Sequence, residues 1–155
     1  MAVFQTFRKG TGTELNRIVS REAFLHLLEM EVKRSRRYQN FFCVLTLRLR
    51  EIAGWGNGPA ARGASLEKLT RVVAEEIRDS DIVGVLSEGA LAVLLPYADA
   101  ASGGCMRTRV ENTLRYHDFQ EGGYRVTVDQ VCFPTDVTDS PELLRKLTGE
   151  ERLTA

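Results

Sequence analysis

Residues 66–96 read LEKLTRVVAEEIRDSDIVGVLSEGALAVLLP. In the first half of this stretch, apolar side chains recur at three- and four-residue spacing, which predicts an amphipathic helix. Two short apolar runs follow over residues 82–86 and 91–95, and each predicts a buried strand. The few residues between the runs include Glu88-Gly89, so the stretch predicts a helix followed by a tight β-hairpin.

The sequence on either side predicts further helices and strands. Upstream, the predicted elements are a helix over 21–38 with Ser20 as its N-cap, a strand over 41–47 and a glycine-rich loop over 53–64. Downstream, they are a helix over 99–117, a strand over 124–133 and a short helix from about Pro141. This order indicates an α/β (α+β) fold with a mixed sheet covered by helices.

Length and composition indicate one domain. The chain has 155 residues, of which 43% are hydrophobic and 27% charged, as is typical of one compact domain. We assign it to residues 15–148, with an N-terminal arm over 1–14 and a C-terminal tail over 149–155. The formal net charge is zero, so we expect neither nucleic acid nor a membrane as a partner. No run approaches the ~18 apolar residues of a membrane helix, and the start lacks a signal-peptide core, so we predict a cytoplasmic protein.

The cysteines give no sign of a metal site or a disulfide framework. Cys43, Cys105 and Cys132 stand far apart in apolar runs, no pair has metal-ligand spacing, and their number is odd. We therefore predict three buried, reduced thiols, and we expect no bound metal and no cofactor.

Three segments share their pattern with one known family. Leu15, Ile18, Arg21 and Phe24 fall at the spacing of an L-T-G-L-x-N-R-R-x-F signature. Residues 66–96 match a helix, an R-x-x-D pair, a spacer of five residues, a hairpin and a strand ending in proline, and residues 124–147 match a late strand and helix. With these segments in this order, the chain resembles the GGDEF (diguanylate cyclase) family. The resemblance implies a nucleotidyl-cyclase-like mixed sheet of about five strands flanked by helices, with a β-hairpin at the degenerate motif.

The same resemblance implies that the catalytic residues have been lost. The family joins two GTP molecules by attack of a 3′-hydroxyl on an α-phosphate, and it uses two metal ions held by carboxylates. Arg48 stands where the family has the carboxylate that ends its first strand, and Arg50 stands where another Asp is usual. The G-G-D-E-F motif itself is replaced by Ser87-Glu88-Gly89-Ala90-Leu91. We therefore expect no enzyme activity and no metal site at this turn.

A second family site is retained in the sequence. Arg78 and Asp81 preserve the R-x-x-D pattern, and Arg109 falls where the family has a third contributor. By resemblance these residues form the inhibitory site that binds an intercalated dimer of cyclic di-GMP, and guanidinium groups suit phosphate and the guanine O6/N7 edge. A structural interpretation stays open beside it: Arg78 at a helix end, Asp81 capping a turn and Arg109 on a solvated helix face.

Two functional hypotheses follow from this resemblance. The first is a non-catalytic module of bacterial signal transduction that acts as a cyclic di-GMP receptor through Arg78, Asp81 and Arg109. The alternative is a ligand-free protein-interaction or scaffold domain. In either case we expect another signalling protein as partner, and a homodimer is plausible by analogy with the family. Asp129 stands where the family's late strand usually carries a glycine, which indicates altered packing near the old nucleotide pocket.

Overall fold

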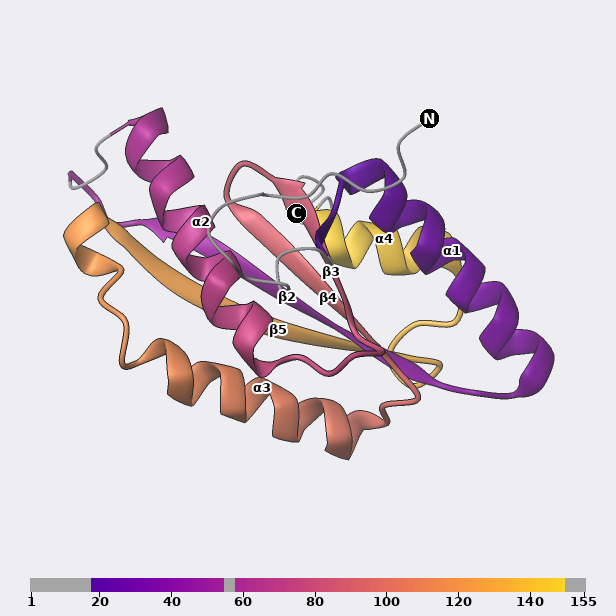
Figure 1. Ribbon diagram of the computed structural model, residues 1–155. Helices are drawn as coiled ribbons and strands as arrows, with labels where there is room; N and C mark the ends of the chain where they lie inside the picture. The colour runs from indigo at the N-terminus through magenta and orange to yellow at the C-terminus, as the bar shows by residue number, and fades with distance from the viewer. Residues whose placement is uncertain (1–17, 55–57, 150–155) are drawn as a thin grey trace.

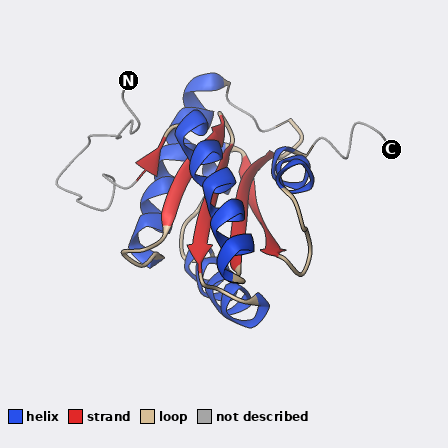
Figure 2. Cartoon of the chain, turned by 90° about the vertical axis from the view of Figure 1, so that its right-hand side faces the viewer, coloured by secondary structure: helices blue, strands red, loops and turns tan. Residues whose placement is uncertain are grey.

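The computed structural model describes residues 18–54 and 58–149, and it shows one sheet with helices on both faces (Figures 1 and 2). The elements in chain order are β1 (Ile18–Val19), α1 (Arg21–Tyr38), β2 (Phe42–Glu51), α2 (Pro59–Glu76), β3 (Ile82–Ser87), β4 (Ala90–Pro96), α3 (Ala100–Leu114), a short 3-10 helix (Gln120–Gly122), β5 (Tyr124–Phe133) and α4 (Ser140–Thr148). The sheet has five strands in the order β1-β3-β4-β2-β5, with β1 parallel to β3 and the other pairs antiparallel. The predicted mixed α/β fold is confirmed.

The alternation of side chains along β2 divides the interior into two apolar layers. Cys43, Leu45 and Leu47 point to the face covered by α2 and α3, where they join one buried cluster. Phe42 and Val44 point to the opposite face and pack in a second cluster with residues of α1 and α4. Because successive residues of a strand face opposite sides, each residue farther along β2 is assigned to one of these layers. Arg48 and Arg50 thus lie on the side of α1 and α4.

The predicted hairpin and first helix are confirmed. β3 and β4 pair antiparallel, Ser87 lies opposite Ala90, and the turn between them is Glu88-Gly89. Ser20 caps α1, since its hydroxyl accepts a hydrogen bond from the Ala23 amide at 3.2 Å. Where α1 crosses β3, a Cβ on Gly84 would come within 2.4 Å of the Phe24 side chain, so this close approach requires glycine.

Several boundaries differ from the predicted ones. The loop predicted over 53–64 is wrong in its second half, because α2 begins at Pro59; proline fits the first turn of a helix, and the alanines that follow are good helix formers. β2 continues to Glu51, and α3 is shorter at both ends than predicted. β1 was not predicted as a strand, since it has two residues and is defined by its pairing with β3.

Two further predictions need comment. Cys105 is exposed on α3, contrary to the predicted burial, whereas Cys43 and Cys132 are buried. Burial raises the pKa of the Cys43 thiol, which keeps it protonated and unreactive.

The predicted arm over 1–14 and the predicted tail beyond Gly149 lie outside the described residues. No helix in the described ranges is both long and apolar enough to span a bilayer.

The short helix α4 is held against the sheet by its buried inner face and by its C-terminal end. Asp139 caps its start by accepting a hydrogen bond from the Glu142 amide at 2.8 Å, and Leu143 and Leu147 are buried on its inner face. At its C-terminal end, the Arg48 guanidinium donates a hydrogen bond to the Leu147 carbonyl. This carbonyl belongs to the negative pole of the helix, where a cation is favourable. Arg48 therefore stabilises the end of α4.

We expect Arg48→Ala to lower the free energy of unfolding by about 1–2 kcal/mol, because it removes a charge-assisted hydrogen bond to a helix-end carbonyl. Arg50→Ala is the matched control, since it deletes the same side chain two residues farther along β2 and should change stability by less than about 0.5 kcal/mol. Urea denaturation of both variants measures the difference. Equal losses in the two variants would contradict a stabilising role for the Arg48 contact.

Candidate functional site

Most of the residues that the resemblance assigns to a degenerate catalytic turn lie together in the structure. The end of β2 and the β3–β4 turn form the walls of an open pocket of about 510 Å³. The predicted residues that line it are Arg48, Arg50, Ser87, Glu88, Gly89 and Ala90. Leu91, the last residue of the degenerate motif, is instead fully buried in the layer under α2 and α3. The positions that match the family motif, apart from Leu91, thus lie around one pocket together with Arg48 and Arg50.

Arginine side chains dominate this pocket. Besides Arg48 and Arg50, it contains Arg62 from the first turns of α2, whose guanidinium lies 3.2 Å from a Glu88 carboxylate oxygen. The Tyr124 phenol and, to a smaller extent, Glu88 raise the pKa of the Arg62 guanidinium, so Arg62 stays charged. Glu88 is the one carboxylate in the Ser87–Leu91 turn, and it forms an ion pair with Arg62.

This set of side chains does not fit the two metal ions that the family's reaction uses. Hard divalent cations need several oxygen ligands, and carboxylates supply most of them. In the described part of the chain, no three His, Cys, Asp or Glu side chains gather as metal ligands. Arg48, at the position of a metal-binding carboxylate in the family, places a positive charge there and donates to the Leu147 carbonyl.

Sequence reasoning missed Arg62 as part of this pocket. The residue lies in the stretch predicted as a loop, and loop residues have no predictable direction. In the structure it lies in α2, whose first turns pass beside the hairpin. Recognition of Pro59 as a helix start would have placed Arg62 on the first turn, but only the tertiary structure shows its contact with Glu88.

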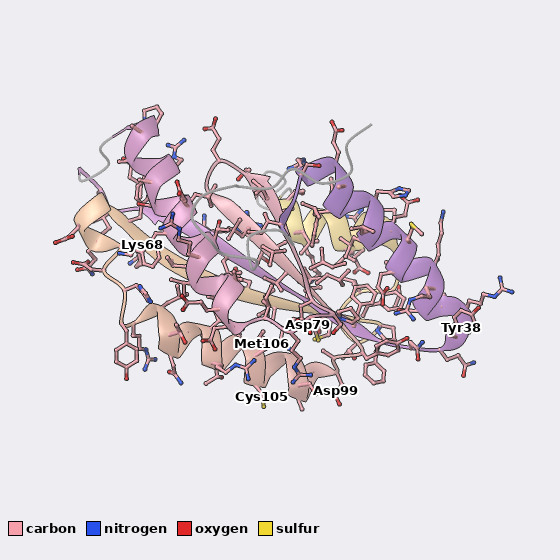
Figure 3. All side chains as sticks on the ribbon, viewed as in Figure 1. Tyr38, Lys68, Asp79, Asp99, Cys105 and Met106 are labelled. Carbon is pink, nitrogen blue, oxygen red and sulfur yellow. The ribbon has the colours of Figure 1, made fainter. Side chains whose placement is uncertain are left out.

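The retained R-x-x-D residues line a second pocket. Arg78, Asp81 and Arg109 surround a pocket of about 90 Å³ between the turn that follows α2 and the first half of α3. Figure 3 labels Cys105 and Met106, two residues of α3 that line this pocket, and Asp99 at the start of α3. The structure therefore brings together three residues that the sequence separates by up to 31 positions (109 − 78 = 31).

Each of the three residues also has contacts within the protein. The Asp81 side chain is 4% exposed in relative terms, and its carboxylate accepts a hydrogen bond from the Arg78 amide at 2.8 Å. The Arg109 guanidinium lies 3.2 Å from the Glu76 carboxylate and donates to the Glu76 carbonyl at 3.1 Å. The predicted capping role of Asp81 is thus observed, whereas the ion pair between Arg109 and Glu76 was not predicted.

An exposed aromatic side chain borders the same pocket. Tyr97 lines it, is 59% exposed and has a positive φ of 60°, which is uncommon for a residue other than glycine. The Arg34 guanidinium lies 4.9 Å from the centre of the Tyr97 ring and donates to its hydroxyl at 2.6 Å. The sequence offered no signal for Tyr97, because its place beside Arg78 follows from the turn after β4.

The fold was compared with known proteins. No protein-family model matches the chain, and no curated protein is significantly similar to it. A DGC protein from Thermotoga maritima matches with a TM-score of 0.72 and 18% identity, over 88% of this chain and 97% of that one. The GGDEF domain of DgcB from Caulobacter crescentus, in complex with c-di-GMP, matches with a TM-score of 0.67 and 10% identity, over 95% and 91%.

A third match is the diguanylate cyclase SiaD from Pseudomonas aeruginosa, in complex with its activator SiaC. Its TM-score is 0.65 at 17% identity, over 88% of this chain and 56% of that one. At such low identities the likeness concerns the fold alone. The mixed five-stranded sheet of this chain, with helices on both faces and a hairpin between β3 and β4, is the fold of GGDEF domains.

Proposed function

We propose that this chain is a non-catalytic signalling module that binds cyclic di-GMP through Arg78, Asp81 and Arg109. The observation that carries the proposal is the convergence of these three residues on one pocket. The turn that would hold catalytic carboxylates is instead lined by three arginines. One site is thus chemically suited to a dianionic guanine nucleotide, and the other is not suited to metal-assisted transfer.

The chemistry of cyclic di-GMP matches the rim of the pocket. Arg78 is exposed and the Arg109 side chain is 51% exposed, so both guanidinium groups can reach phosphates or the O6/N7 edge of guanine. The pocket of about 90 Å³ is smaller than the ~300–1,000 Å³ that usually enclose a ligand, so the nucleotide would lie across its mouth. A protein of the same fold, DgcB, has been solved with this ligand.

The lack of catalysis is proposed on electrostatic grounds. Attack on an α-phosphate builds up negative charge that metal ions neutralise, and the metals themselves need carboxylate ligands. Arg48 donates to the end of α4, and Glu88 pairs with Arg62. A metal-binding rearrangement would have to break both contacts.

A ligand-free interaction domain is the second candidate. The observation in its favour is that Asp81 and Arg109 already make contacts within the chain, to the Arg78 amide and to Glu76. These contacts can serve the fold without any nucleotide. Proteins with this fold do bind protein partners, as SiaD does with its activator SiaC. Purification with one stable partner, together with no nucleotide binding, would favour this candidate.

We expect isothermal titration of the full chain with cyclic di-GMP to show binding at low-micromolar Kd or tighter. Arg78→Ala should weaken binding by at least about tenfold, because it removes a charged hydrogen-bond donor worth about 1.5–3 kcal/mol. Arg71→Ala is the matched control, since Arg71 is an exposed arginine of α2 that does not line the pocket and pairs with Glu67 in the described part of the chain. It should leave binding unchanged.

A second variant tests the role of Arg109 in the same titration. Glu76→Gln keeps the shape of the side chain and removes the charge that pairs with Arg109. If Arg109 contacts the ligand, loss of its ion pair with Glu76 should tighten cyclic di-GMP binding by several-fold. Flat titrations of folded wild-type protein would reject the receptor proposal and leave the interaction domain.

We expect no production of cyclic di-GMP from GTP with Mg²⁺ or Mn²⁺, as followed by chromatography over hours. Arg48→Asp, which returns a carboxylate to the end of β2, should not create activity, because the new carboxylate and Glu88 would lie beside Arg50 and Arg62 and still make a poor metal site. Product that increases linearly with enzyme and time in the wild-type protein would contradict the non-catalytic proposal.

A further inference from the structure

β5 leaves part of one sheet edge open. Ile52 donates to the Gly123 carbonyl at 2.9 Å, which extends the ladder between β2 and β5 and fixes its phase. Arg125, Thr127 and Asp129 therefore direct their backbone groups toward β2, and the residues between them direct theirs outward. Among residues 18–54 and 58–149, no backbone hydrogen bond reaches the outward groups of residues 126, 128 and 130.

Local contacts close this edge at both ends. The Tyr124 amide donates to the Phe119 carbonyl at 3.1 Å. The Cys132 amide donates to the Asp136 carboxylate at 2.8 Å, and its carbonyl accepts from the Asp136 amide at 2.8 Å. The open edge is thus limited to residues 126–130, and β1 at the opposite edge has only two residues. An open strand edge is a template for pairing with another strand.

The charges along this segment are self-complementary. Arg125 and Asp129 are both exposed and lie on the same face of β5, two residues before and two residues after Thr127. Within the described residues neither forms an ion pair. Arg125 lies opposite Arg50 of β2, and like charges in this position repel. A negative charge on the other side of Arg125 would relieve that repulsion.

We propose that two copies of this chain associate through antiparallel pairing of their β5 edges, with the two-fold axis at Thr127. In this register Arg125 of each copy lies opposite Asp129 of the other, so the dimer gains two cross-strand ion pairs. Val126 lies opposite Val128 of the other copy, and their outward backbone groups bond across the interface. The two sheets become one continuous sheet, and the interface is isologous.

The surface beside this edge has room for the added strand. A groove of about 680 Å³ runs between β5 and the end of α3, and Val126, Val128, Leu114 and Phe119 line it. Tyr116, at its rim, is 89% exposed. The valines of a second β5 would enter this groove and cover apolar side chains there. A second copy would supply the opposite charges and would also fill the groove. Because the formal net charge of the chain is zero, two copies do not repel each other through their net charge.

Charge reversal tests the register. Analytical ultracentrifugation of the full chain without nucleotide should show a concentration-dependent dimer. Arg125→Asp and Asp129→Arg each place two like-charged pairs across the axis, and each should raise the dimer Kd by at least about tenfold. An equimolar mixture of these two variants should form a heterodimer, because each cross-strand pair between them then joins an aspartate to an arginine. The double variant should likewise dimerise again, since it exchanges the two charges within each pair.

Glu75→Arg is the matched control for Asp129→Arg, because it makes the same charge change at an exposed position of α2 and should leave the Kd unchanged. Both tested side chains are exposed, so thermal unfolding should show folded variants. A wild-type protein that stays monomeric at several hundred micromolar would overturn the proposal. A dimer that resists both reversals, or no association in the mixture, would also overturn it. Since no nucleotide is present, these outcomes are independent of cyclic di-GMP binding.

Discussion

β2 holds the sheet together, because it pairs with β4 on one side and, in register along all ten residues, with β5 on the other. Its alternating side chains determine what lies in each helix layer. The apolar residues near its start fill both layers, and its last residues carry arginines toward α1 and α4. The same pairing fixes which backbone groups of β5 face outward. The register of β2 therefore determines the two apolar layers, the pocket beside the β3–β4 turn and the open edge of β5.

The arginines beside the β3–β4 turn make contacts within the protein. Arg48 ties β2 to the end of α4, and Arg62 pairs with Glu88 across the pocket mouth. The Arg48 contact stabilises the end of α4, whereas the exposed pair between Arg62 and Glu88 adds little to stability. Both contacts place arginines where the family's reaction would require bound cations. The pocket around Arg78, Asp81 and Arg109 lies apart from this turn and shares no residue with it. The proposed absence of catalysis and the proposed ligand site are therefore physically compatible in one domain.

Local patterns in the sequence were sufficient for the hairpin, for α1 with its Ser20 cap, and for the grouping of Arg78 with Asp81. They were insufficient where long-range contacts decide the outcome. β1 exists only because it pairs with β3, and the partner of Arg48 is 99 positions away. The contact of Glu76 with Arg109 depends on how α2 packs beside α3. The start of α2 was missed for a local reason, since the glycines around Pro59 concealed a helix start.

We propose that cyclic di-GMP binds at the turn after α2 and not at the hairpin between β3 and β4. Amide hydrogen exchange of the full chain, with and without the nucleotide, tests it most directly. We expect slower exchange over residues 78–81 and in the first half of α3, with no change over residues 87–90. Slower exchange confined to the hairpin, or no change anywhere at saturating nucleotide, would contradict it.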